Sequence, residues 1–209
     1  MQLEKKNKIL NNLYLLKTMG YKYINENELL NNSNSNLLPS NINELNDIVN
    51  NCNLCSISNS CNNKIFFKGD YKSKIIFIVN KAFKDDKTYE LFKNILKSIL
   101  NIDIQNILIL NVLKCDANIN TDDYKNDIDL CKRYTLKQIE ILKPKLIIAL
   151  GSSYKYLKEE NNIKKGILLK YNNIDLFVSY DLEYILRNPS IKKDVLIHYK
   201  KINTIMEKI

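Results

Sequence analysis

Apolar residues in the second half of the chain form short continuous runs, and segments with helical spacing separate these runs. Residues 74–80, 107–113 and 145–151 are rich in Ile, Leu and Val. Runs of this length and composition are typical of strands buried on both faces. Between them, residues 89–100 and 122–142 repeat apolar side chains every three or four positions, as amphipathic helices do. The alternation of strands and helices predicts a parallel sheet.

Two further apolar segments follow these elements. Residues 167–171 and 174–180 flank Asn172 and Asn173, a pair typical of a hairpin turn, and a helical pattern follows Pro189. We therefore predict an α/β fold: a three-layer α/β/α sandwich with a central, mostly parallel four-stranded sheet.

The first forty residues differ from the rest. Residues 3–19 have the spacing of an amphipathic helix, and residues 31–40 are polar and low in complexity, a composition that does not support a packed core. We expect a helical N-terminal extension and linker over residues 1–40, followed by one domain over residues 41–209.

The composition, 45% hydrophobic and 26% charged residues, is that of an ordinary globular domain. No run reaches the eighteen or so uncharged apolar residues that a membrane span needs, and the N-terminus lacks the apolar core of a signal peptide. We expect a cytoplasmic monomer without a membrane partner.

The chain is basic, with 32 Lys and Arg against 23 Asp and Glu and a formal net charge of +9. Such an excess favours an acidic partner, above all a nucleic acid. The heavy use of Lys, Asn and Ile is also typical of an AT-rich genome, and nucleotide bias explains the same charge. Both interpretations stay open at this point.

Five cysteines in a chain without secretory features favour metal or redox chemistry over disulfides. Cys52 and Cys55 form a Cys-x-x-Cys pair, whereas Cys115 and Cys131 lie on distant elements, and we leave Cys61 without a ligand role. Two ligands from a turn and two from elsewhere suit a 4Fe-4S cluster, and a four-cysteine zinc site is the alternative. The spacing favours a metal site over the other interpretation, in which Cys115 and Cys131 are small buried hydrophobes.

Ligands of open parallel sheets bind beyond the carboxyl ends of the strands. Asn80, Asn111, Gly151 and Asp181 lie at or near the carboxyl ends of the predicted strands, so we expect function there. The single histidine, His198, lies in the predicted C-terminal helix, away from every predicted strand end, and we assign it a structural or surface role.

Several motifs together resemble the iron-sulfur, family-4 uracil-DNA glycosylases from about residue 42 to the C-terminus. That family carries a Cys-x-x-Cys pair, a Phe-x-x-Gly segment, an Asn-Val-x-Lys-Cys segment and a fourth Cys on the next helix. It also carries an Asn past the third Cys, a Pro-x-x-Ile-x-x-Leu-Gly run and a Leu-Arg-x-Pro ending. The matching positions here are Cys52 and Cys55, Phe66 and Gly69, residues 111–115, Cys131, Asn120, residues 144–151 and residues 186–189.

The resemblance implies a 4Fe-4S cluster on Cys52, Cys55, Cys115 and Cys131, and it implies DNA, single-stranded or uracil-containing, as the partner. It also implies that Asn111 reads the edge of the base. Four basic residues near the same edge are expected to contact phosphates. They are Lys81, Lys84, Lys114 and Arg187.

The family's remaining active-site groups are not present in this chain. Asn80 or Lys81 stands where the family has a water-activating carboxylate, and Asp181 stands where it has a charge-stabilising His. The segment with the base-stacking Phe looks deleted around residues 84–88, and Phe83 and Tyr180 are the aromatic residues nearby.

The sequence accordingly favours a protein of DNA base-excision repair that binds DNA or docks a partner, with reduced or lost glycosylase activity. One alternative is an active hydrolase in which Asp85, Asp86 or Asp181 supplies the carboxylate. The other is a zinc domain without a DNA role.

Overall fold

The computed structural model describes residues 9–10, 13–14, 16–17, 22, 38–61, 63–83, 85–117, 124–158 and 163–209. The chain divides into two compact units, one formed by residues 1–64 and 115–141 and the other by residues 65–114 and 142–209. Most of the linker expected over residues 31–40 and most of the helix expected over residues 3–19 lie outside the described residues. A domain boundary at residue 40 therefore stays a prediction.

The second unit contains a six-stranded sheet with the order β1-β3-β2-β4-β6-β5. Its strands are β1 (Lys68–Gly69), β2 (Ile75–Val79), β3 (Leu108–Asn111), β4 (Leu146–Leu150), β5 (Ile167–Tyr171) and β6 (Ile174–Ser179). The four inner strands run parallel to one another, and the edge strands β1 and β5 pair antiparallel. The predicted α/β fold with a four-stranded parallel centre is confirmed, and β1 is an addition to it.

The β5–β6 hairpin turns where the sequence predicts it. Asn172 and Asn173 have φ angles of 46° and 68°, a left-handed conformation that Asn adopts more readily than most residues. The turn makes β5 an antiparallel edge strand, so the first residues of β5 lie beside the last residues of β6.

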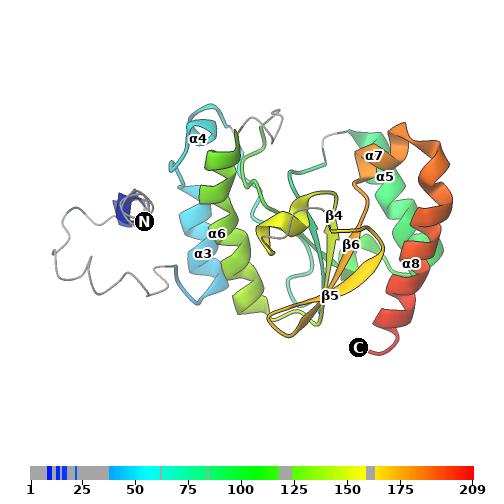
Figure 1. Cartoon of the computed structure of the whole chain (residues 1–209). Helices are drawn as coiled ribbons and strands as arrows, with labels where there is room; N and C mark the ends of the chain where they lie inside the picture. Colours follow the sequence, from blue (N-terminus) through cyan, green and yellow to red (C-terminus); the bar gives the residue numbers. More distant parts are fainter. Residues whose placement is uncertain are drawn as a thin grey trace. The chain divides into compact units, whose positions relative to one another are not determined.

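Helices of the second unit gather on one side of its sheet (Figure 1). They are α5 (Asp86–Ile95), which continues as a π-helical turn (Leu96–Leu100), α7 (Leu182–Arg187) and α8 (Lys192–Met206). Short 3-10 helices complete the unit at Ile104–Asn106, Ser153–Tyr156 and Pro189–Ile191.

The core between this sheet and its helices is aromatic and aliphatic. Phe77 of β2 pairs with Ile109 on one side and Ile148 on the other, and its ring meets that of Phe92 on α5 edge-on at 5.0 Å. All of these side chains are buried, as is Tyr199 of α8. Burial of the continuous apolar runs explains why they form strands instead of surface helices.

The first unit contains the helices α3 (Ile42–Asn50), α4 (Ser56–Ser60) and α6 (Lys125–Leu142). Asn41 begins α3 as its N-cap, and its side-chain oxygen accepts a hydrogen bond of 2.8 Å from the backbone N–H of Asn43. α6 matches the long helix expected from the apolar spacing.

The backbone at residue 69 explains why the Phe-x-x-Gly segment has a glycine at this position. Its φ angle is +98°, and a Cβ atom at this position would lie 2.0 Å from the carbonyl oxygen of Ile107. Strand β1 approaches β3 this closely because glycine has no side chain.

We expect Gly69→Ala to lower the free energy of unfolding by more than about 2 kcal/mol, because it adds both backbone strain and a clash with backbone. Urea denaturation measures this loss. Lys97→Ala, at an exposed helical position, is the control and should change stability by less than about 0.5 kcal/mol. Equal stability of the two variants would show that β1 does not need glycine.

Candidate functional site

Two asparagines lie side by side at the carboxyl ends of β2 and β3. Val79 pairs with Asn111, and the pairing continues as the backbone N–H of Leu113 donates to the carbonyl oxygen of Asn80 over 2.9 Å. Asn111 is 3% exposed. The expectation that these residues share one edge of the sheet therefore matches the geometry.

The side chain of Asn80 is held from the neighbouring strand. Its Nδ2 donates to Oγ of Ser152, just after β4, over 2.7 Å. Its Oδ1 is buried and accepts no hydrogen bond from the described residues. A buried amide oxygen without a donor is an expected contact point for water or a ligand.

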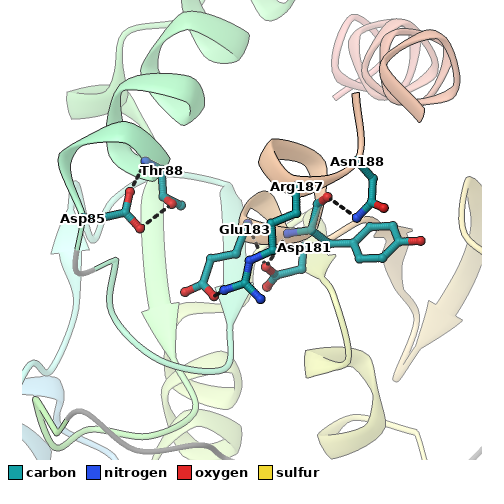
Figure 2. A network of polar contacts seen from close by, with 7 residues as sticks. Asp85, Thr88, Asp181, Glu183, Arg187 and Asn188 are labelled. Carbon is teal, nitrogen blue, oxygen red and sulfur yellow. Dashed lines mark hydrogen bonds and ion pairs between the residues drawn. The ribbon is translucent and has the colours of Figure 1, made fainter. Parts of the chain in front are cut away.

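Asp181 follows β6 directly and begins α7. Its Oδ1 accepts hydrogen bonds from the backbone N–H groups of Glu183, at 2.9 Å, and Tyr184, at 3.4 Å. Figure 2 shows this carboxylate at the start of the helix. Its other oxygen lies against Gly151, where a Cβ atom would be 3.0 Å from Oδ2. The residue at the position of the family's histidine is thus a helix N-cap.

Asp85 has the same role at the start of α5. Its carboxylate accepts hydrogen bonds from the backbone N–H of Thr88 and, at 2.8 Å, from the Thr88 hydroxyl, as Figure 2 also shows. The N–H of Thr88 is the main cause that lowers the pKa of Asp85. Asp86, in the first turn of the helix, is exposed.

Both aromatic residues that the sequence suggested for stacking on a base pack against other rings of the protein. Phe83 packs on Phe92, 5.4 Å between ring centroids, at the edge of the core. Tyr180 stacks on His198 at 5.3 Å and on Tyr184 at 5.9 Å, with nearly parallel planes in both pairs.

His198 lies at the end of β6, so the expectation that it lies away from every strand end is wrong. Its Nδ1 is 3.3 Å from the hydroxyl of Ser179, the last residue of β6. Gly166 lies against the other side of the ring, since a Cβ atom there would be 2.2 Å from Nε2. Burial lowers the pKa of His198. The imidazole is a packed core group, as its assigned structural role requires.

The basic residues expected to contact phosphates differ in their exposure and in their contacts. Lys114 is 2% exposed, and its ammonium donates to the carbonyl oxygen of Asn111 over 2.6 Å, so it points inward. Arg187 is exposed and pairs with Glu183 at 3.5 Å. Lys81 is half-buried, whereas Lys84 lies outside the described residues, as does Asn120.

Lys165 lies at the same edge of the sheet and was not found from the sequence. Its ammonium donates to the carbonyl oxygen of Gly151 and lies 4.5 Å from the centre of the Tyr154 ring. The pKa of Lys165 is lowered to about 8, first by burial and then by the neighbouring charge of Lys155, while Asp181 opposes the shift. Lys165 precedes β5, and an antiparallel strand begins where its parallel neighbours end. The rule that functional residues follow parallel strands therefore does not point to Lys165.

All five cysteines are free thiols and belong to the first unit. Cys115 forms an antiparallel bridge with Lys64, which brings the preceding segment and its Cys61 alongside. Burial raises the pKa of the Cys115 thiol, and the neighbouring thiols of Cys61, Cys131 and Cys55 raise it further.

The thiol of Cys52 contacts a buried tyrosine. The hydroxyl of Tyr134, on α6 one turn after Cys131, donates to the sulfur of Cys52 over 3.3 Å, and Tyr134 is 1% exposed. Within the described part of the chain, no three His, Cys, Asp or Glu side chains stand in position to hold a metal ion. The donor chemistry nevertheless fits an iron-sulfur cluster, because thiols that resist ionisation in a buried site are stabilised by a metal that replaces their protons.

The parallel sheet with amide side chains at its carboxyl edge defines an α/β protein, a class in which ligands bind beyond the carboxyl ends of the strands. The model of the uracil DNA glycosylase superfamily matches residues 66–202. The chain therefore belongs to the uracil-DNA glycosylase superfamily. No helix among the described residues is long and apolar enough to cross a membrane.

Similar proteins carry the name type-4 uracil-DNA glycosylase. One from Sulfurisphaera tokodaii is 27% identical over 74% of this chain and 80% of its own length. Another, from Saccharolobus solfataricus, is 27% identical over 75% of this chain and 82% of its own length. The resemblance to the family-4 branch that the motifs indicate is thereby confirmed.

The capping role of Asp181 predicts that two substitutions of this residue differ in their effect on stability. Asp181→Ala should lower the free energy of unfolding by about 1 kcal/mol, whereas Asp181→Asn should leave it nearly unchanged, because Asn is as good an N-cap as Asp. Urea denaturation of the two variants measures the difference. An Asp181→Asn variant as unstable as Asp181→Ala would show that the charge, and not the cap, is what the site requires.

Proposed function

We propose that this chain is an iron-sulfur protein of DNA base-excision repair that binds DNA at the carboxyl edge of its sheet and hydrolyses the glycosidic bond weakly or not at all. The observation that carries this proposal is the capping role of the two acids nearest the missing groups. Asp85 and Asp181 each use their carboxylate to accept hydrogen bonds from the start of a helix.

Removing a base from DNA requires an extruded nucleotide, an activated water and a donor that stabilises negative charge on the departing base. A charge-stabilising donor is worth about 3 to 4 kcal/mol, and a general base is worth about a hundred- to ten-thousandfold in rate. A carboxylate at the position of the histidine repels the anion that forms on the base. Since Asp181 is held in place as a cap, moving it to a water-activating position would cost the helix its N-cap.

The groups that recognise a base are retained better than the groups that perform chemistry. Asn111 is buried at the end of β3, at the position of the family's base reader. Asn80 presents a buried oxygen that accepts no hydrogen bond from the described residues. This polar edge supports recognition of a base more strongly than it supports hydrolysis.

We assign the cluster to Cys52, Cys55, Cys115 and Cys131. When bound, a 4Fe-4S cluster ties a loop, the segment after β3 and helix α6 together through iron-sulfur bonds, which stabilises the fold. The Tyr134 hydroxyl is placed to donate a hydrogen bond to the sulfur of Cys52. Cys61 is the fifth thiol and has no ligand role in this assignment.

The decisive measurement is single-turnover base release from uracil-containing single-stranded DNA, with protein in excess and cluster occupancy verified on the same anaerobic sample. We expect DNA binding with base release reduced at least a hundredfold relative to a type-4 relative. Efficient release that Asn111→Ala abolishes would instead establish an active hydrolase. Asp181→Asn, which keeps the cap, then tests whether Asp181 supplies the carboxylate.

The ligand assignment predicts opposite outcomes for two neighbouring cysteines. Cys115→Ser should lose most of the bound iron and the visible absorption of the cluster, and its stability should fall with them. Cys61→Ser, the matched control, should keep both. Full iron content in Cys115→Ser, or equal loss in Cys61→Ser, would contradict the assignment, and zinc without visible absorption would establish the four-cysteine zinc site.

A further inference from the structure

Lys165 places a positive charge at the edge of the sheet that the proposed function uses for DNA. It donates to the carbonyl oxygen of Gly151, directly after β4, and the same glycine lies against Asp181 at the end of β6. Gly151 in turn donates its N–H to the carbonyl oxygen of Ser179 over 3.1 Å. The ammonium therefore lies where β4 and β6 end.

The charge of Lys165 is poorly compensated. The ammonium is half-buried and forms no ion pair with any described residue, and Lys155 repels it while Asp181 attracts it from beyond ion-pair distance. Lys137, which is more deeply buried, pairs with Glu140 at 2.8 Å. A partly desolvated cation without a counter-ion is unfavourable unless a ligand supplies the negative charge.

The Lys165 ammonium also has more N–H donors than its contact with Gly151 uses. It carries three N–H groups, and one of them donates to Gly151. The ring of Tyr154 covers one side of the ammonium at 4.5 Å, a favourable cation–π contact that orients it without using a hydrogen-bond acceptor. At least one donor is therefore left for an anion.

We propose that Lys165 binds a backbone phosphate of the DNA strand whose base is presented to Asn111. This inference rests on the proposed function and names the contact that anchors the strand. It also replaces Lys114, whose ammonium points inward, as a phosphate-binding residue at this edge.

The contact makes DNA affinity depend on pH in a defined direction. Lys165 is charged below its pKa of about 8 and becomes neutral as the pH rises through that value, so affinity is present at pH 7 and falls toward pH 9. The charged and titratable groups that face it are Lys155, Asp181 and Tyr154. Arginine at position 165 stays charged throughout this range.

The experiment measures binding of a uracil-containing single-stranded oligonucleotide by fluorescence anisotropy between pH 6.5 and 9.5 at constant ionic strength. The full-length, cluster-loaded protein is compared with Lys165→Met, Lys165→Arg and Lys170→Met. Lys170 is an exposed lysine on β5 that pairs with Asp175, so Lys170→Met removes the same charge five residues further along the chain. Urea denaturation of each variant verifies that it is folded.

We expect Lys165→Met to bind about tenfold more weakly at pH 7 than Lys170→Met, because a hydrogen bond to a charged group is lost. The slope of log affinity against log salt should fall by about 1 in Lys165→Met. Wild-type affinity should fall several-fold between pH 7 and 9, whereas Lys165→Arg should bind with little change over this range.

Two outcomes overturn the inference, and they are distinguishable. If the wild type binds DNA while Lys165→Met and Lys170→Met bind alike, the phosphate contact is wrong and the proposed function stands. If the loaded wild type does not bind DNA at any pH, both the proposed function and the contact fail. A pH dependence that persists unchanged in Lys165→Arg would also assign the titration to another group.

Discussion

The pairing of β2 with both β3 and β4 is the constraint on which the rest of the second unit depends. It brings residues 80, 111 and 151 to one edge, although they are far apart in the sequence. Parallel strands end together, so their following residues meet whatever the intervening helices contain. Both the polar edge and its anchoring to Ser152 follow from this register.

The two carboxylates that the sequence offers as substitutes for the family's catalytic groups serve as helix caps. Asp85 and Asp181 both begin helices and accept backbone N–H groups that otherwise lack partners. A carboxylate that caps a helix stabilises the fold, and its hydrogen bonds to the backbone leave it poorly placed to accept a proton from water. This capping role is the reason that we propose DNA binding with little or no hydrolysis for this chain.

The thiols that we assign to the iron-sulfur cluster come from separate segments of the first unit and not from a repeated motif. Cys115 pairs with Lys64 in an antiparallel bridge, and Cys131 lies on α6, one turn before Tyr134. Burial is the first cause that raises the pKa values of the Cys55 and Cys115 thiols. A metal that binds thiolates relieves that cost, which links cluster loading to the stability of the first unit.

The sequence by itself determined strands β2 to β6, the hairpin at Asn172 and the long helix that carries Cys131, because apolar periodicity and turn residues act locally. It also placed Asn80 and Asn111 at one edge through the rule for parallel strands. Only the tertiary structure decided that Lys114 points inward, that His198 packs beside Ser179 and that Lys165 reaches Gly151. These facts depend on which side chains fill the space between elements, and local pattern carries no information about that space.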